Sequence, residues 1–304
     1  MKRLVLIDGH AILHRAYHAF PKNLKTRKGE IVNAVYGFTR MLLRVIDDLK
    51  PDYIAVAFDL PQPTFRHKEF IGYQAQRPQM EAELASQIQR VHQVVETLNI
   101  PIFEKMGYEA DDVIGTLAKQ AAQRGVGVVI VTGDRDIMQL VKSKIKVYAP
   151  LKGFSQAKLF GKKEVEKLLG VEPEQIVDYK ALMGDSSDNY PGVPGIGPKT
   201  AVQLLGQYRD LDTVYNNLAE LRPVVAKKLT EGLESAELSK KLAQIVTNAP
   251  IKLSLKACRV HDYDEKKAIN LFEELEFKSL IRRLPGVEEN LGKKTKEKKQ
   301  MKLI

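Results

Sequence analysis

Four short apolar runs lie in the first half of the chain, each bounded by glycine or polar residues. They span residues 3–8, 53–59, 128–132 and 145–149. Runs of this length are typical of buried parallel strands. Between them, apolar residues recur at helical spacing over 35–49, 84–98 and 111–124. This alternation predicts an α/β fold, a wound and mainly parallel sheet with helices on both faces.

The pattern changes near residue 158, where strand-like runs give way to short helices broken by glycine and proline. Helices are expected at 162–170, 174–184, 199–208, 223–233 and 264–275. We therefore expect an α/β domain over 1–160 and a small all-helical domain over 161–285. A lysine-rich segment, 286–304, is expected to be a disordered tail.

The composition is that of a soluble globular protein, with 44% hydrophobic and 28% charged residues among 304. No apolar run reaches the ~18–20 residues that span a bilayer, so no membrane association is expected. The single cysteine excludes an internal disulfide and indicates a reducing compartment such as the cytoplasm. The net charge of +10 predicts an acidic partner such as nucleic acid.

Three of the apolar runs end on aspartate, at Asp8, at Asp59, and at Asp134 with Asp136. The carboxyl ends of parallel strands meet at one edge of a sheet, where α/β proteins keep their chemistry. Taken singly, each of these aspartates is also explained as a helix N-cap or a turn former.

Two further acidic clusters favour a joint role. They are Glu109, Asp111 and Asp112 in one segment, and Asp185 and Asp188 in another. Carboxylates gathered in one place repel one another unless cations neutralise them. Oxygen-only ligands favour Mg²⁺ or Mn²⁺ over zinc, and two such ions support phosphodiester cleavage. The nine carboxylates together predict a site with two or more divalent ions that faces a polyanion.

A competing metal motif lies on the first predicted helix. His10, His14 and His18 recur every four residues, a spacing that can chelate zinc or nickel. The alternative is a polar stripe beside the acidic site, since no third acidic or cysteine partner is evident locally. No phosphate-binding glycine motif follows the first strand, so the sequence does not favour a nucleotide cofactor.

A glycine-rich stretch, GVPGIGPKTA, occupies residues 192–201. Its glycines permit a tight turn between two helices, and the N–H groups that begin the second helix favour a phosphate. A nucleic-acid backbone is expected to bind there, at Gly192, Val193, Gly195, Ile196, Gly197, Lys199 and Thr200.

Five segments in this order carry a family resemblance: LVLIDG, VAFD, GYEADDVIGTLA, VTGDRDIMQLV and GDSSDNYPGVPGIGPKTA. They resemble the 5′→3′ exonuclease domain of bacterial DNA polymerase I, which belongs to the flap endonuclease family. The resemblance runs from Leu4 to about Pro285. It implies a PIN-like nuclease core, a helix–hairpin–helix element, and metal-dependent hydrolysis of DNA 5′ ends and flaps during replication and repair. It also implies that all nine carboxylates are metal ligands and that the hairpin backbone binds K⁺.

The resemblance further implies an arch over residues 60–82 that orders around a single strand. The family carries Tyr-Lys-x-x-Arg in this arch, with a lysine that reaches the scissile phosphate. Here the motif reads Tyr73-Gln74-Ala-Gln-Arg77, and Gln74 supplies no charge, so weaker transition-state stabilisation is expected. The residues expected to act directly in catalysis or in positioning the 5′ strand are Asp8, Asp59, Arg66, Tyr73 and Arg77.

The metals are expected to divide the acids into two regions. Asp59, Glu109, Asp111 and Asp112 should hold mainly one region, and Asp134, Asp136, Asp185 and Asp188 the other. Two other functions stay open, a non-catalytic junction-binding module and a PIN-type ribonuclease. The expected partners are DNA with 5′ flaps, nicks or gaps and a DNA polymerase, and the chain is expected to be a nucleoid-associated monomer. Because the lysine-rich tail resembles a terminus, a complete nuclease is favoured over a fragment of a longer polymerase.

Overall fold

A six-stranded sheet forms the centre of the first half of the chain. The structure, a computed structural model, describes residues 1–150, 157–260 and 262–285. The predicted tail, 286–304, lies outside the described residues. The strands are β1 Arg3–Asp8, β2 Tyr53–Ala57, β3 Ile102–Phe103, β4 Gly127–Val131, β5 Ile145–Pro150 and β6 Ala157–Phe160. Their order is β3-β2-β1-β4-β5-β6, and all neighbours are parallel except β5 and β6.

Helices cover both faces of this sheet, as predicted. They are α1 Gly9–Ala19, α2 Asn33–Leu49 and α5 Ile88–Thr97 on one face and α6 Ala110–Gln123 on the other. Leu4 and Leu6 of β1 pack with α6, whereas Val5 and Ile7 pack with α1 and α2. Successive strand side chains point to opposite faces, so one apolar strand serves both cores.

The helix predicted at 84–98 is two helices, α4 Ala82–Ala85 and α5. The interruption lies at Gln87, whose side chain is buried and faces the start of α2. Its carboxamide oxygen accepts from the N–H groups of Ala34 at 2.8 Å and Val35 at 3.3 Å, and its amide donates to Asn33. Gln87 thus satisfies donors of a helix that has no side-chain cap of its own.

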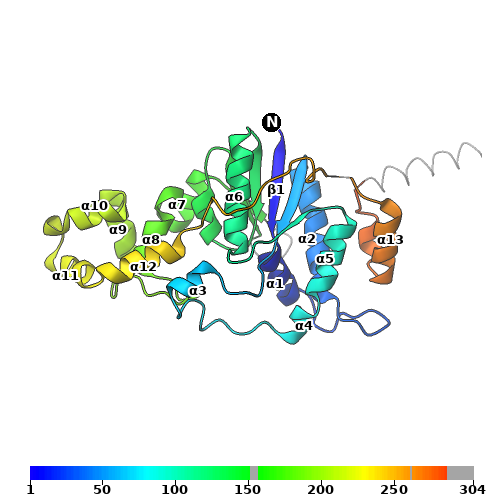
Figure 1. Cartoon of the computed structure of the whole chain (residues 1–304), viewed down its shortest axis with the longest axis horizontal. Helices are drawn as coiled ribbons and strands as arrows, with labels where there is room; N and C mark the ends of the chain where they lie inside the picture. Colours follow the sequence, from blue (N-terminus) through cyan, green and yellow to red (C-terminus); the bar gives the residue numbers. More distant parts are fainter. Residues whose placement is uncertain (151–156, 261, 286–304) are drawn as a thin grey trace, which may run out of the picture.

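The second half is helical, with α7 Lys162–Leu169, α8 Ile176–Met183, α9 Pro198–Tyr208, α10 Leu211–Asn216, α11 Pro223–Glu231 and α12 Leu233–Ala243. Figure 1 shows α9 to α12 at one end of an elongated molecule and α13, Glu265–Glu274, at the other. Helices α10 and α12 of this half were not predicted, nor was the short α14, Lys278–Ile281. Among the described residues, no helix is long and apolar enough to cross a membrane.

A return segment, residues 244–253, runs from α12 back along α6. Four residues spaced by four on α6 and its C-cap hydrogen-bond its backbone: Asp112, Thr116, Gln120 and Arg124. This spacing places them on one face of the helix. A Cβ atom at Gly115 would lie 2.9 Å from the Ile245 side chain, so the glycine permits the close approach. The segment fixes the helical half against the sheet.

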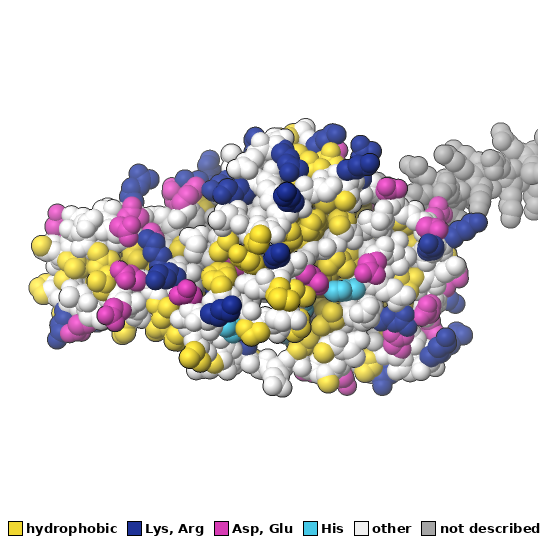
Figure 2. All heavy atoms as spheres, viewed as in Figure 1, with side chains coloured by type: hydrophobic (Ala, Val, Ile, Leu, Met, Phe, Trp, Pro, Cys, Tyr) yellow, Lys and Arg dark blue, Asp and Glu magenta, His cyan; other side chains and the backbone are white. Residues whose placement is uncertain are grey.

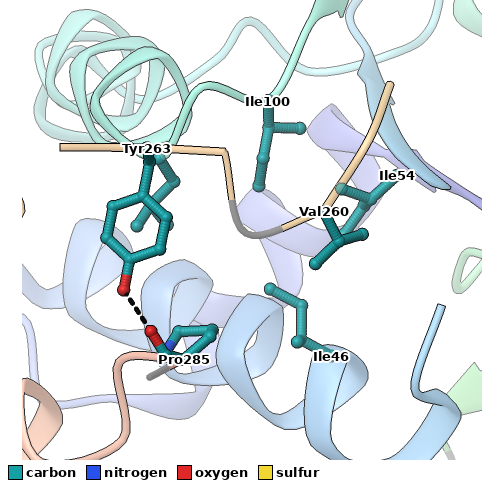
Figure 3. A pocket seen from close by; sticks show the side chains of 7 residues that line it. Ile46, Ile54, Ile100, Val260, Tyr263 and Pro285 are labelled. Carbon is teal, nitrogen blue, oxygen red and sulfur yellow. Dashed lines mark hydrogen bonds between the residues drawn. The ribbon is translucent and has the colours of Figure 1, made fainter. Parts of the chain in front are cut away.

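Helix α13 packs against α5, on the face of the sheet opposite α6. The chain around it closes over an apolar cavity of about 10 Å³, lined by residues that include Ile54, Val260 and Tyr263 (Figure 3). The Tyr263 hydroxyl donates to the Pro285 carbonyl at 2.7 Å across this cavity. A space this small and apolar has no room for a ligand. The boundaries of the two domains, at residues 160 and 285, stay predictions.

Candidate active site

Asp8 ends β1 and is held at two points. Its Oδ1 accepts from the Ala11 N–H at 3.0 Å, which makes it the N-cap of α1. Its Oδ2 accepts from the Thr132 hydroxyl, beyond the end of β4, at 2.7 Å. Asp8 is therefore both the N-cap of α1 and a candidate site residue, and its carboxylate is fixed at the carboxyl edge of the sheet.

Asp59 follows β2 at the same edge. Its Oδ1 accepts from the N–H of Ala110, the first residue of α6, at 2.7 Å. The His10 ring lies 3.4 Å from its other oxygen. Because α6 begins beside Asp59, the acids at the start of that helix are brought to the strand ends.

Glu109 is the N-cap that precedes α6, and Asp112 is the third residue of that helix. Asp112 reaches back to the Glu109 N–H at 3.1 Å. The Glu109 carboxylate lies 3.2 Å from Arg66 and accepts from the Tyr73 hydroxyl at 3.3 Å. The two acids therefore lie side by side on Arg66.

Asp112 is inaccessible to solvent, and both its oxygens are taken. Arg66 donates to them at 2.8 and 2.9 Å, and the N–H groups of Glu109 and Val246 add one bond each. The Arg66 side chain is only 2% exposed and also bonds the Leu242 carbonyl. These contacts favour a structural role for both residues over the predicted metal ligand and strand contact.

A second acidic group, Asp136, Asp185 and Asp188, lies beside the first. Each of the three places one carboxylate oxygen within 4.8 Å of the others. The loop that carries the last two is closed by backbone bonds between Asp185 and Tyr190, at 2.9 and 3.1 Å. Gly192, with a φ of +62°, lies against the backbone of residue 184, where a Cβ atom would clash.

This second group already contains positive charge. The Lys180 ammonium, in the last turn of α8, pairs with both Asp136 and Asp185. Arg77 donates to Asp188 at 2.6 Å. Lys180 was not predicted, although a basic residue near a helix C-terminus five residues before an aspartate was a usable signal.

The pKa values of the clustered acids are shifted in different directions. Burial, with the repulsion of Asp59 and Asp134, raises the pKa of Asp8 to about 7. Burial raises the pKa of Glu109 to about 7 and that of Asp111 well above its ordinary value, with Asp134 the first of several acids that add to the shift in Asp111. In the second group, burial raises the pKa of Asp136 to about 6. The pKa of Asp185 is lowered, because the Lys180 hydrogen bond outweighs the opposing effect of burial. Asp134 adds to the raised pKa values of Asp8 and Asp111 in the first group and of Asp136 in the second, so it acts electrostatically on both.

The arch is anchored on the loop of the second group. Its helix α3 is Phe65–Glu69. The Gln74 backbone N–H donates to the Asp188 carbonyl at 2.9 Å, and its side chain donates to the Asp188 carboxylate at 3.2 Å. The Tyr73 ring is buried and only its hydroxyl faces Glu109 and Asp188, so Arg77, half-exposed, is the predicted strand contact that solvent reaches.

The predicted histidine stripe does not converge. His10 contacts Asp59 and the ring of Phe58. His14 and His18 lie one turn further on, with their Nε2 atoms 3.4 Å apart at the surface. The three rings therefore share no common centre.

The hairpin residues divide into a buried set and an exposed set. Val193 and Ile196 are 2% and 4% exposed and belong to the core of the helical half. Gly195, Gly197 and Lys199 are exposed. On the face drawn in Figure 2, described Lys and Arg side chains are interspersed with acids, with no continuous basic stripe.

Two family models cover most of the chain. The N-terminal resolvase-like domain of the 5′-3′ exonucleases matches residues 3–170, and their C-terminal SAM fold matches residues 171–266. The chain belongs to the 5′-3′ exonuclease family. This confirms the resemblance stated above and makes the chain a nuclease by family.

Relatives of this 5′-3′ exonuclease agree in sequence and in fold. DNA polymerase I of Chloroflexus aurantiacus is 44% identical over 291 residues, which cover 93% of this chain and 31% of that protein. The chain thus spans about a third of the length of the curated relatives it matches. The zinc-bound T5 5′-exonuclease has a TM-score of 0.70 at 18% identity, over 90% of this chain and 99% of that one. A bacteriophage T5 flap endonuclease in complex with DNA and metal ions has a TM-score of 0.69 at 19% identity, over 90% and 100%.

Proposed function

We propose that this chain hydrolyses phosphodiester bonds at DNA 5′ ends and flaps, as a structure-specific nuclease of replication and repair. The observation that carries the proposal is the gathering of Asp8, Glu109 and Asp111 where β1 ends and α6 begins. Loss of hydration and mutual repulsion raise their pKa values, and both effects favour a bound cation. The likeness to a T5 enzyme whose structure contains DNA and metal ions supports the same class of substrate.

The donor set at this edge fits divalent metal ions. The acids offer carboxylate oxygens, and oxygen-only sets favour Mg²⁺ or Mn²⁺. Within the described part of the chain, the buried Tyr190 hydroxyl near Asp136 and Asp185 has no hydrogen-bond partner, and the water shell of an ion would supply one. When bound, two such ions supply a hydroxide nucleophile and stabilise the leaving oxygen. We propose as their ligands Asp8, Asp59, Glu109, Asp111, Asp134, Asp136, Asp185 and Asp188.

The protein's own groups hold these carboxylates in place. Thr132 fixes Asp8, and the Ala110 N–H fixes Asp59. Lys180 neutralises part of the second group, and Arg77 is the arch cation that we propose contacts the 5′ strand. Such preorganisation lowers the cost of assembling charge in the transition state.

The hairpin at 192–200 is proposed to hold the duplex. K⁺ binding there would use backbone carbonyls, but those of Gly192 and Gly195 already accept from Ser235 at 2.6 Å and Lys228 at 2.9 Å. The hairpin therefore does not offer these two oxygens freely, and no step is assigned to K⁺. A cytoplasmic, nucleoid-associated monomer that works with a DNA polymerase completes the proposal.

The decisive assay is cleavage of a 5′-flap DNA with Mg²⁺. Wild type should cut the flap near its junction, and Asp134→Ala should lose at least about a hundredfold in rate. Asp212→Ala, which changes an exposed acid far from this edge, serves as the control. A wild-type rate no higher than that of Asp134→Ala would sink the proposal. A matched RNA flap tests the ribonuclease alternative, which predicts faster cleavage of RNA.

A further inference from the structure

The hairpin is clamped by α11 and α12, which come later in the chain. The Ser235 hydroxyl, on α12, donates to the Gly192 carbonyl, and the Gly192 N–H donates to Ser239 at 3.0 Å. On the other side, the Lys228 ammonium, on α11, donates to the Gly195 carbonyl. Each contact comes from the segment 223–243 and engages the backbone of a hairpin glycine.

Lys228 lies directly over the hairpin turn. A Cβ atom at Gly195 would be 2.8 Å from the Lys228 nitrogen and 3.0 Å from its Cε, so the side chain rests on the glycine. Gly195 has a φ of +79°, the left-handed region that favours glycine. The left-handed backbone of Gly195 and its lack of a side chain together leave room for the Lys228 ammonium.

A hollow of about 300 Å³ opens beside this contact, between the hairpin and the start of α11. Its walls include Ile196, Thr200, Arg222, Val224 and Lys228. An ammonium has three N–H donors, and one is used on Gly195. The hollow therefore presents two cationic side chains and a hydroxyl, a set that suits one phosphate group.

We propose that Lys228 is the built-in cation of this hairpin, joining the Gly195 carbonyl to a phosphate of the DNA backbone in the adjacent hollow. An ammonium and a potassium ion carry the same charge and are of similar size. Lys228 thus takes the position of an external monovalent ion, and DNA binding at the hairpin does not depend on K⁺. The inference deepens the proposed function and rests on it for the identity of the polyanion.

The test is the dissociation constant for a fluorescent 5′-flap duplex, measured in EDTA in potassium chloride and in tetramethylammonium chloride of equal concentration. Wild type should bind equally, within about twofold, in both salts. Lys228→Met should bind about tenfold more weakly in tetramethylammonium, the loss of one charge-assisted contact, and recover part of this in K⁺. Lys227→Met is the matched control, because Lys227 is 75% exposed and pairs with Glu231, at 3.7 Å, on its own helix. It should change the dissociation constant less than twofold in either salt.

Either of two results overturns the inference: wild type binding several-fold more weakly without K⁺, or Lys228→Met matching Lys227→Met. Recovery by K⁺ distinguishes a cation role from a merely structural one, and the neutral variant Lys228→Gln replaces the methionine variant if that variant fails to fold. Flap cleavage by wild type in Mg²⁺ is scored separately. If wild type does not cleave the flap but the dissociation constants in the two salts are as expected, the proposed function alone is contradicted. If wild type cleaves the flap but those dissociation constants are not as expected, this inference alone is contradicted.

Discussion

Arg66 on the arch and Asp112 on α6 form a bidentate ion pair, at 2.8 and 2.9 Å, in which neither side chain reaches solvent. The same two residues bond the backbone of the return segment, at Gln244 and Val246. The pair therefore joins three parts of the chain that are distant in sequence.

Arg66→Ala should lower the free energy of unfolding by about 3–5 kcal/mol, because it leaves the Asp112 charge buried without its partner. The double variant Arg66→Met with Asp112→Leu should be less destabilised than the single variant. Urea unfolding measures both, with Arg77→Ala as the half-exposed control. If Arg66→Ala unfolds like wild type but binds flap DNA poorly, Arg66 contacts the strand, as first predicted.

Gln74→Lys should raise the single-turnover rate of flap cleavage by about tenfold or more at saturating Mg²⁺, because it adds a positive charge beside Asp188. The Mg²⁺ concentration for half-maximal rate should rise as well, since the new ammonium competes for that carboxylate. Gln76→Lys adds the same charge two residues away, at an exposed position, and should change neither quantity. An unchanged rate in Gln74→Lys would show that the arch substitution does not limit catalysis.

Lys180→Met should make the protein more dependent on divalent ions. Without Lys180, the carboxylates of Asp136 and Asp185 have lost their shared partner, so the metal-free protein is less stable. Added Mg²⁺ should raise the melting temperature of this variant more than that of wild type. Lys162→Met, which removes a surface pair with Glu172, is the control. An equal Mg²⁺ effect in Lys180→Met and wild type would mean that Lys180 and the ions do not compete.

The metal-free protein should lose stability as pH rises from about 4 to about 7. The pKa values of Asp8 and Glu109 are both about 7 in the folded chain, against ordinary values of 3.8 and 4.5, so the folded state binds protons that the unfolded state has released. Saturating Mg²⁺ should flatten this decline, because metal ions take the place of those protons. Urea midpoints at several pH values, with EDTA or Mg²⁺, measure the effect. Asp8→Asn should flatten the EDTA profile, and a midpoint that rises with pH in EDTA would contradict the assignment.

The ends of β1, β2 and β4 were predictable because each is an apolar strand of five or six residues that ends at, or just before, an aspartate. Strand β3 has two residues, and β6 is an edge strand with two exposed residues, so neither shows a clear alternation of apolar and polar residues. The role of Asp112 was not predictable, because its neighbour Val246 lies 134 residues away. Local spacing places Glu109 and Asp112 together, whereas the return of the chain along α6 adds the Val246 N–H to Asp112 alone. The position of Lys180 depended on the same kind of long-range contact.

Helix α6 carries Glu109 and Asp111 at its beginning, and its side chains hold the return segment along the rest of its length. That segment continues directly from α12, which grips the hairpin at Gly192. The hairpin, where a duplex would be held, and the acids, where a strand would be cut, are thus both attached to α6. The number of nucleotides between the junction and the cut would then be set by the protein backbone and would be the same for every DNA sequence.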